Sequence, residues 1–437
     1  TDAHSSSGIC TPSRYALLTG RYHWRKFHDI VDSWEPTVFD PGEQTLPGLL
    51  ADLGYRSACI GKWHLGWDWS AIRKPDAEQI AVDGARKTWP AEAFDWSKPI
   101  PGGPLDHGFH FYFGDDVPNF PPYAWIENDR VLIAPTVAYE PDPKPNEGAP
   151  EGRPGPMVEG WKQDEVMPAL TRKAVEWIAG RNDAGPPFFL LFSWTSPHAP
   201  ILPAPEWQGR TEAGPYGDFV AQSDWCAGQV LQALDERGFR ENTLVIFTSD
   251  NGPERYAYDR IRNHGHRSMG PLRGLKRDIW EGGHRVPFVV RWPGIVAPGT
   301  VCDALISQID LLATIAAIVD AKLPAGAASD SFDQSALLRG ERQGARPSLV
   351  HNTYRDHYAI RRDQWLLIDA APGAVSNVPA WFDEANGYIP DGHPAALYNL
   401  REDLSQRHNL FAAYPGLVDE LRGELRRIRE RGTSVSR

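Results

Sequence analysis

The chain has 437 residues and a net charge of −12. This length predicts one large domain with a smaller one, and the acidic balance argues against a nucleic-acid backbone as the main partner. No apolar run approaches membrane-spanning length. The four cysteines are too few for a disulfide framework and fall at no metal-ligand spacing: Cys10, Cys59, Cys226 and Cys302.

The first predicted element is a helix that opens at Cys10 and runs toward Gly20. Cys10 stands in the frame Cys-x-Pro-Ser-Arg, so Arg14 follows four residues later and shares a helix face with the thiol. An ordinary buried cysteine before a helix carries no such frame. A plain cysteine nucleophile needs a histidine close in space rather than this frame. The pattern marks Cys10 and Arg14 as candidates for chemistry.

Short apolar runs further along the chain end in polar residues. They span 55–60, 188–194 and 243–249, and another run at 286–290 follows Gly282 and Gly283. Near-continuous apolar runs predict strands that are buried on both faces, as in a parallel sheet flanked by helices. Ligands bind at the carboxyl ends of such strands. The polar residues that follow the first three runs are Lys62, His64, His198, Asp250 and Asn251.

The remaining pattern predicts an α/β fold: a large mixed, mostly parallel sheet between helices, with a smaller C-terminal antiparallel sheet and helix. Helical patterns cover 170–178 and 219–234, and Gly and Pro cluster in a predicted surface loop over 141–156. Beyond Ala345, the segments 348–354 and 358–369 predict antiparallel strands with alternating faces, and 415–431 predicts an amphipathic helix. We expect a catalytic domain over 1–345 and a small α+β domain over 346–437.

A short basic segment contrasts with the acidic whole. It contains Arg260, Arg262, His264, His266, Arg267, Arg273, Lys276 and Arg277. Net charge governs solubility, whereas a local run of cations can govern a site that binds anions. We expect this segment to lie near the site.

The Cys10 frame, closed by Thr19-Gly20, resembles the signature of type I, formylglycine-dependent sulfatases, which are arylsulfatase-like members of the alkaline phosphatase superfamily. Segments 61–66, 196–200, 249–252, 270–276 and 281–287 resemble further family segments in order. The resemblance covers nearly the whole chain. It implies sulfate ester hydrolysis, one Ca²⁺ ion and a formylglycine produced from Cys10 by a formylglycine-generating enzyme.

The resemblance also implies a role for each candidate. The catalytic residues would be Cys10, Arg14, Lys62, His64, His198 and Lys276. Cys10 is the precursor of the nucleophile, and Arg14 holds the converted group. The two lysines bind sulfate oxygens as point charges. His198 protonates the leaving oxygen, and His64, which we expect to lie alternate to Lys62 on an extended segment, takes a proton from the nucleophile. The metal ligands would be Asp250, Asn251 and the converted Cys10.

The sequence departs from the family ahead of the signature. Family members begin with a strand that ends in an Asp-Asp pair, and this chain starts too close to Cys10 to hold it. Asp250 and Asn251 alone fall short of the roughly six to eight oxygens that Ca²⁺ takes. Asp115 and Asp116 are a stand-in by composition, but a surface turn is the better prediction for them. We therefore expect the chain to be a fragment of a longer gene product.

The substrate prediction rests on aromatic and basic residues. Trp63 and the tryptophans after it could stack on sugar rings, although packing is an equal alternative, and His266 with Arg267 could contact anionic groups. We expect a sulfated polysaccharide or oligosaccharide, with simple aryl sulfates next. A phosphonate or phosphodiester hydrolase of the same superfamily and a non-catalytic glycan-binding module stay open. We expect the protein to be exported, to the periplasm or outside the cell.

Overall fold

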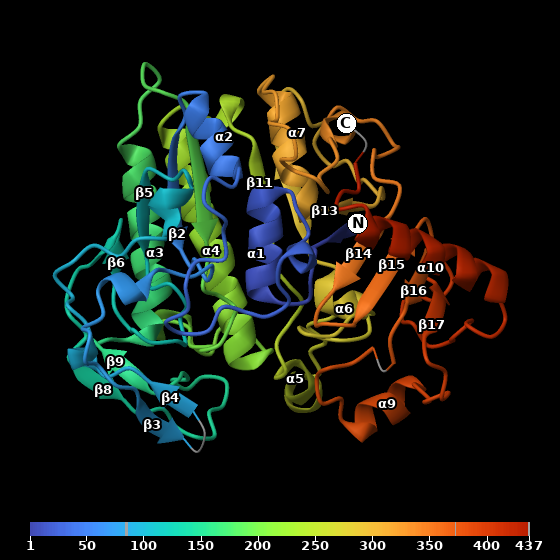
Figure 1. Cartoon of the computed structure of the whole chain (residues 1–437), viewed down its shortest axis with the longest axis horizontal. Helices are drawn as coiled ribbons and strands as arrows, with labels where there is room; N and C mark the ends of the chain where they lie inside the picture. The colour runs from blue at the N-terminus through green and yellow to red at the C-terminus, as the bar shows by residue number, and fades with distance from the viewer. Residues whose placement is uncertain (84–85, 372, 436–437) are drawn as a thin grey trace. The chain divides into compact units, whose positions relative to one another are not determined.

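The computed structural model describes residues 1–83, 86–371 and 373–435, which form two compact units. The first unit joins Thr1–Ile30 to Glu241–Arg437, and the second is Val31–Arg240. Figure 1 draws the elements of both. The predicted domain boundary after residue 345 lies inside the first unit and stays a prediction.

The second unit contains a five-stranded mixed sheet with the order β10-β2-β5-β6-β7. β2 (Arg56–Gly61) pairs in parallel with β10 (Phe188–Ser193) and β5 (Phe111–Gly114), while β6 (Ile126–Glu127) and β7 (Arg130–Val131) continue the sheet antiparallel. The strands predicted over 55–60 and 188–194 are confirmed. Ala58, Cys59 and Ile60 are fully buried, as a strand covered on both faces requires.

Helices cover this sheet. α3 (Val166–Ala179) packs against β2, β5 and α4 (Gly214–Glu236), and α2 (Leu46–Asp52) packs against β2 (Figure 1). Both longer helices include their predicted segments. Two hairpins complete the unit: β3 (Ile80–Asp83) with β4 (Arg86–Thr88), and β8 (Val137–Tyr139) with β9 (Gly155–Met157). The predicted loop over 141–156 is confirmed apart from its last two residues, which belong to β9.

The first unit begins with the chain's own N-terminal segment. β1 (Ala3–His4) pairs in parallel with β13 (Ile306–Ser307), and α1 (Cys10–Thr19) packs against α7 (Leu311–Ile318). Gly20 ends α1 in the left-handed conformation, with φ 63°, and a Cβ there would meet the Cβ of Ser331 at 2.9 Å. Glycine is therefore required both for the turn and for the close approach.

The strand predicted over 286–290 does not join a parallel sheet. It forms β12 (Phe288–Arg291), which pairs antiparallel with β11 (Val245–Thr248). Neither strand is buried on both faces as predicted, because Phe247 of β11 and Val289 of β12 are exposed. An apolar run predicts a strand but not its direction or its neighbours, so the sequence alone could not separate the two pairings. The α/β fold class and its mixed sheet are confirmed.

The C-terminal sheet is antiparallel in the order β14-β15-β16-β17, and α10 (Pro415–Glu430) packs on it as predicted. The strands are β14 (Leu349–Asn352), β15 (Tyr358–Arg362), β16 (Trp365–Ile368) and β17 (Ala396–Asn399). The expected alternation of faces is wrong, because both faces are covered. Val418, Leu421 and Leu425 of α10 cover one face, and Ile279 and Trp280 cover the other.

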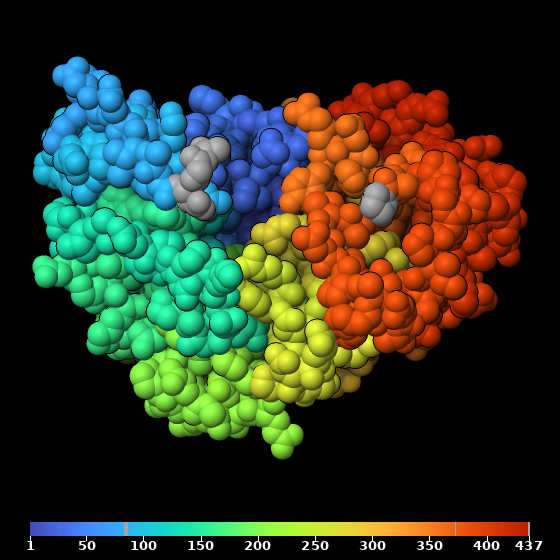
Figure 2. All heavy atoms as spheres, turned by 90° about the horizontal axis from the view of Figure 1, so that it is seen from below, coloured from blue at the N-terminus to red at the C-terminus, as the bar shows by residue number. Residues whose placement is uncertain are grey.

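The described residues of the first unit also form four shorter α-helices: α5 (Ala257–His264), α6 (Glu281–His284), α8 (Ser335–Leu338) and α9 (Ala380–Asn386). A small core of Tyr258, Met269, Phe382 and Tyr388 joins α5 to the segment around α9. Figure 2 shows the two side by side on the surface, in yellow and orange. Among the described residues, no helix is long and apolar enough to cross a membrane.

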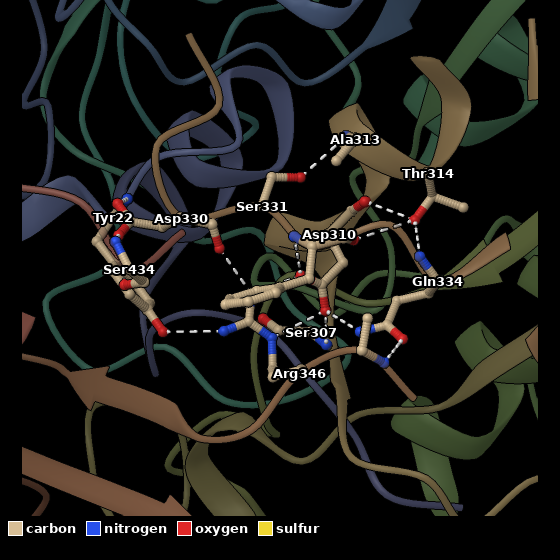
Figure 3. Close-up of polar contacts among 12 residues, drawn as sticks. Tyr22, Ser307, Asp310, Ala313, Thr314, Asp330, Ser331, Gln334, Arg346 and Ser434 are labelled. Atoms are coloured by element: carbon tan, nitrogen blue, oxygen red, sulfur yellow. Dashed lines mark hydrogen bonds and ion pairs between the residues drawn. The ribbon is translucent and has the colours of Figure 1, made fainter. Parts of the chain in front are cut away.

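A buried ion-pair network stabilises the first unit beside α7 (Figure 3). Arg346 forms a bidentate contact with Asp310, at 2.9 Å from Nε to Oδ2 and 2.5 Å from Nη2 to Oδ1. It also donates to the carbonyls of Asp330 and Ser348 and to the Tyr22 hydroxyl. Burial alone would lower the pKa of Arg346, but Asp310 and the other neighbouring acids raise it, so the guanidinium stays charged.

Candidate active site

The candidate site in the first unit begins where α1 meets the loop after β11. The Cys10 thiol donates to Asn251 Oδ1 at 3.3 Å, and Arg14 Nε donates to Asp250 Oδ2 at 2.8 Å. Cys10 and Arg14 therefore share one face of α1, as their spacing predicts. Gly252 lets the loop lie close to the Gly282 backbone, which a Cβ at this position would overlap.

Lys276 lies in the same site, paired with a residue that the sequence analysis did not single out. Its Nζ is 2.5 Å from Glu254 Oε1, and Arg277 Nη1 is 3.2 Å from Glu254 Oε2. One carboxylate thus holds two adjacent cations. The Lys276 side chain is 4% exposed, whereas that of Arg277 is 40% exposed.

The charges around Lys276 keep it cationic. Burial alone would lower its pKa, but Cys10 and Glu254 outweigh burial and raise it. The pKa of Arg277 is also raised, because Glu254 and Tyr354 outweigh the effect of burial. Two fixed positive charges therefore lie beside the Cys10 thiol, in an arrangement that favours anions.

Lys62 and His64 lie in the second unit. Lys62 directly follows β2, is buried, and donates its backbone N–H to the Ser193 carbonyl. His64 has φ 56°, so the segment turns there, and the prediction of an extended segment is wrong. Its backbone N–H donates to Asp116 Oδ1 at 3.0 Å, and its Nε2 donates to the Val31 carbonyl at 2.9 Å. The hydrogen bond to Asp116 stabilises this turn, which the predicted extended segment did not include.

Asp115 is not part of a surface turn, because its side chain is buried. Burial and the neighbouring Asp116 raise its pKa to about 7, while Lys62 acts in the opposite direction. The sequence suggested a surface turn because the pair follows a Phe-rich segment and precedes Pro118. In the structure the Asp115-Asp116 pair packs against the segment after β2, where the Trp63 N–H donates to the Asp116 carbonyl.

His198 follows β10, as predicted, and is partly buried. Its Nδ1 lies 2.6 Å from the Ala199 carbonyl. A carbonyl only accepts hydrogen bonds, so Nδ1 carries a proton, and Nε2 is the atom through which the ring exchanges another.

The predicted substrate-binding residues have mixed outcomes. Trp63 is 1% exposed and packs between Phe39 and Phe109, so the prediction that its ring faces a sugar is wrong. Arg267 is exposed and donates to Asn386 Oδ1 at 3.1 Å. His266 is partly buried, and burial together with Arg260 lowers its pKa. The roles of His266 and Arg267 stay predictions.

Much of the basic segment serves packing rather than the site. Arg260 is buried and donates to Ser268 Oγ. Arg273 lies between two aromatic rings, 3.8 Å from the Trp280 centroid and 4.1 Å from that of Tyr388. Cation–π contacts and burial use these charges within the fold. Arg277, by contrast, pairs with Glu254 beside Lys276.

The oxygen donors near Cys10 suit a hard divalent cation in kind but not in number. Asp250 and Asn251 supply carboxylate and amide oxygens, while Ca²⁺ takes about six to eight. One Asp250 oxygen also accepts from Arg14. The two residues alone therefore do not complete a calcium site.

A second group of possible metal ligands has different chemistry. His4, His284 and His351 are buried with their ring nitrogens close together, and Asp2 accepts from His4 Nε2 at 3.0 Å. Burial lowers the pKa of His284 to about 4 and that of His351 further below its usual range. Neutral imidazoles are poor ligands for Ca²⁺, so this cluster is not the predicted calcium site.

Comparison with known proteins identifies the family. The sulfatase family model matches residues 1–321, and the model for the C-terminal part of N-sulphoglucosamine sulphohydrolase matches residues 275–373. The chain belongs to the sulfatase family. This sulfatase is 32% identical to N-acetylgalactosamine-6-O-sulfatase of Bacteroides thetaiotaomicron, over 99% of this chain and 86% of that protein. It is 30% identical to human arylsulfatase A, over 98% of this chain and 79% of that protein.

Solved structures agree. A sulfatase from work on the metabolism of multiple glycosaminoglycans by Bacteroides thetaiotaomicron superposes with a TM-score of 0.80 and 29% identity, covering 99% of this chain and 91% of that chain. A Pseudoalteromonas sulfatase shares the fold, with a TM-score of 0.71, 22% identity, and coverage of 100% of this chain and 84% of that chain. The predicted family and fold are confirmed, and the protein is a sulfuric ester hydrolase.

Sequence reasoning missed Glu254 as the carboxylate that Lys276 and Arg277 share, and it missed that Asp115 is buried. Glu254 lies three residues after Asn251, close enough to the strand end to have been considered. Arg277 was included in the basic segment but was not separated from the arginines that pack internally. No sequence signal marks Asp115 as buried.

Proposed function

We propose that this sulfatase hydrolyses sulfate monoesters on a poly- or oligosaccharide, with a formylglycine derived from Cys10 as its reactive group. The observation that carries the proposal is the gathering of Arg14, Asp250, Asn251 and Lys276 around the Cys10 thiol. A relative named as an N-acetylgalactosamine-6-O-sulfatase supports a sugar sulfate, so N-acetylgalactosamine 6-sulfate is the first substrate to test.

The converted side chain would supply a hydrated aldehyde, one hydroxyl of which is the nucleophile toward sulfur. The chain's own residues prepare for that chemistry. Arg14 fixes the Asp250 carboxylate at 2.8 Å. Lys276, held charged by Glu254, offers a fixed cation to a sulfate oxygen. Preorganised charge of this kind stabilises the negative charge that develops in the transition state.

Residues of the second unit complete the proposed roles. Lys62 would bind sulfate oxygens, and His64 would take a proton from the nucleophile. His198 would protonate the leaving oxygen through Nε2, because its Nδ1 proton already binds the Ala199 carbonyl. These roles rest on the family resemblance, and substitution of each residue tests them.

Aryl sulfates are the second candidate substrate class. The 30% identity to human arylsulfatase A favours them. Both substrate classes require conversion of Cys10, so a formylglycine-generating enzyme is the proposed maturation partner. We also propose that the protein is exported.

Sulfate release tests the proposal. The chain is produced with a formylglycine-generating enzyme, and conversion of Cys10 is confirmed by peptide mass. We expect release of inorganic sulfate from N-acetylgalactosamine 6-sulfate, with higher kcat/KM than for nitrophenyl sulfate. Removal of divalent cations by a chelator is expected to lower the rate. A converted, folded chain that hydrolyses only the nitrophenyl ester would replace the sugar substrate with the aryl one.

A further inference from the structure

Arg277 differs from the other cations of the site because its charge is held in place and yet faces solvent. Lys276 and Arg277 each contact one oxygen of Glu254, but Lys276 is sealed at 4% exposure while Arg277 is 40% exposed. A guanidinium has five N–H donors, and Nη1 alone reaches Glu254. The exposed part of the side chain can therefore bind a ligand without breaking this ion pair.

The backbone at Arg277 is fixed in an unusual conformation. Its φ is 84°, in the left-handed region that favours glycine. The Arg277 N–H donates to the Gly8 carbonyl at 2.8 Å, and Gly8 lies two residues before Cys10. A Cβ on Gly8 would lie 2.9 Å from the Asp278 carbonyl oxygen. Residues with such strain persist where the surroundings fix them, and they cluster at functional sites.

Tyr354 adds a hydroxyl whose oxygen accepts a hydrogen bond from the Arg277 guanidinium and whose O–H is left to donate. It is partly buried, and burial raises its pKa while Arg277 and Lys276 act in the opposite direction. The phenol is therefore a neutral hydrogen-bond donor at physiological pH, next to two cations. A planar guanidinium with a neighbouring hydroxyl suits the paired oxygens of a carboxylate or a sulfate.

We propose that Arg277, assisted by the Tyr354 hydroxyl, forms a subsite for a second anionic group of the substrate, a carboxylate or a second sulfate close to the sulfate ester. This inference rests on the proposed function, since Lys276 would bind the sulfate that is cleaved. It makes Arg277 a specificity-determining residue that selects sugars bearing a second negative charge.

Arg277→Gly is the variant of choice, because glycine adopts the left-handed backbone without strain while the side chain is removed. Arg277→Lys keeps the charge but loses the planar fork. Arg401→Ala removes an exposed arginine outside the site and serves as the matched control. Thermal unfolding of Arg277→Gly is expected at or above the wild-type temperature, which separates loss of the subsite from loss of fold.

Two matched pairs of probes identify the anion. The first is a uronate–N-acetylgalactosamine 6-sulfate disaccharide and its counterpart with the carboxyl group reduced to an alcohol. The second is N-acetylgalactosamine 4,6-disulfate and the 6-sulfate. We expect wild type to prefer the doubly charged member of at least one pair. Arg277→Gly should reduce that preference by about tenfold or more, with partial retention in Arg277→Lys.

The pair that loses its preference shows which anion the subsite takes. Equal losses on both members of both pairs, or a wild type without preference, would overturn the inference even if sulfate release is normal. Calorimetric binding of the same probes to Cys10→Ala chain gives a readout that does not depend on turnover. A sulfatase that releases no sulfate from any probe refutes the proposed function, while the binding preference still decides the subsite.

Discussion

Two ion-pair clusters in the first unit have different functions: Arg346 with Asp310, called the structural cluster, and Glu254 with Lys276 and Arg277, called the site cluster. Arg346 and Asp310 have side chains that are 0% and 3% exposed, and hydrogen bonds reach both Asp310 oxygens (Figure 3). In the site cluster, one carboxylate, Glu254, serves both Lys276 and Arg277. The first cluster contains matched charges, whereas the second has two cations for one anion.

The difference shows how a fold separates structural from functional charge. A buried ion pair whose polar atoms are all hydrogen-bonded cannot bind a ligand as well. Removal of one partner leaves the other as an unpaired buried charge. A cluster with excess positive charge and a partly exposed guanidinium is ready for an anion. Substitutions in the first cluster should therefore change stability, and those in the second should change activity.

The largest expected effect is on turnover and comes from substitution of Cys10, beside the site cluster. Cys10→Ala removes the precursor of the nucleophile, so sulfate release should fall by at least ~10³-fold. Because Cys10 is a small side chain at the start of α1, the unfolding transition should move little. Cys302→Ala, at an exposed cysteine, is the control and should keep full activity. Turnover by Cys10→Ala at the wild-type rate would contradict the placement of the active site at Cys10.

The next effect tests the structural cluster. Arg346→Met leaves Asp310 buried without its ion-pair partner, so the free energy of unfolding should fall by about 3–5 kcal/mol. Urea unfolding measures it, with Arg401→Met as the exposed control. Where the variant is still folded, its kcat/KM should be near wild type. A large loss of activity without loss of stability would break the distinction between the clusters.

Asp115 extends the comparison to the second unit, because its buried Oδ1 has no hydrogen-bond partner among the described residues, unlike the Asp310 oxygens. Burial raises its pKa to about 7, so between about pH 4 and 7 the folded chain keeps a proton that the unfolded chain has lost. The contribution of the Asp115 carboxyl to the free energy of unfolding therefore falls as the pH rises through that range.

Asp115→Asn removes this pH dependence. Relative to wild type, the free energy of unfolding of the variant should increase by roughly 2–4 kcal/mol as the pH rises from about 4 to 7. Urea unfolding at about pH 4 and about pH 7 measures this increase. Asp76→Asn, at an exposed aspartate, should show no such trend. A pH-independent difference for Asp115→Asn would mean that the carboxyl is ionised in the folded chain.

The smallest effect concerns the ion pair that holds the site's cations. Glu254→Gln keeps the shape but removes the charge that helps raise the pKa of Lys276. We expect kcat/KM to fall by roughly tenfold, and the alkaline fall in activity to begin at lower pH, since Lys276 would lose its proton earlier. A uniform loss at all pH values would instead indicate that Glu254 only shapes the loop.

The sequence predicted the parts of the site that depend on local spacing. Four-residue spacing on one helix placed Cys10 and Arg14 together, and the end of an apolar run placed Asp250 and Asn251 after β11. It failed where long-range packing decides. Nothing local shows that Trp63 packs into a core, that β12 runs antiparallel to β11, or that both faces of the C-terminal sheet are covered.

If the residues around Cys10 form the active site of this sulfatase, activity must depend on conversion of that cysteine. The most direct test compares sulfate release with the fraction of Cys10 that carries the aldehyde, measured by peptide mass in preparations with graded amounts of the formylglycine-generating enzyme. We expect specific activity toward N-acetylgalactosamine 6-sulfate to rise in proportion to that fraction, from zero in unconverted protein. Activity that is independent of conversion at position 10 would contradict it.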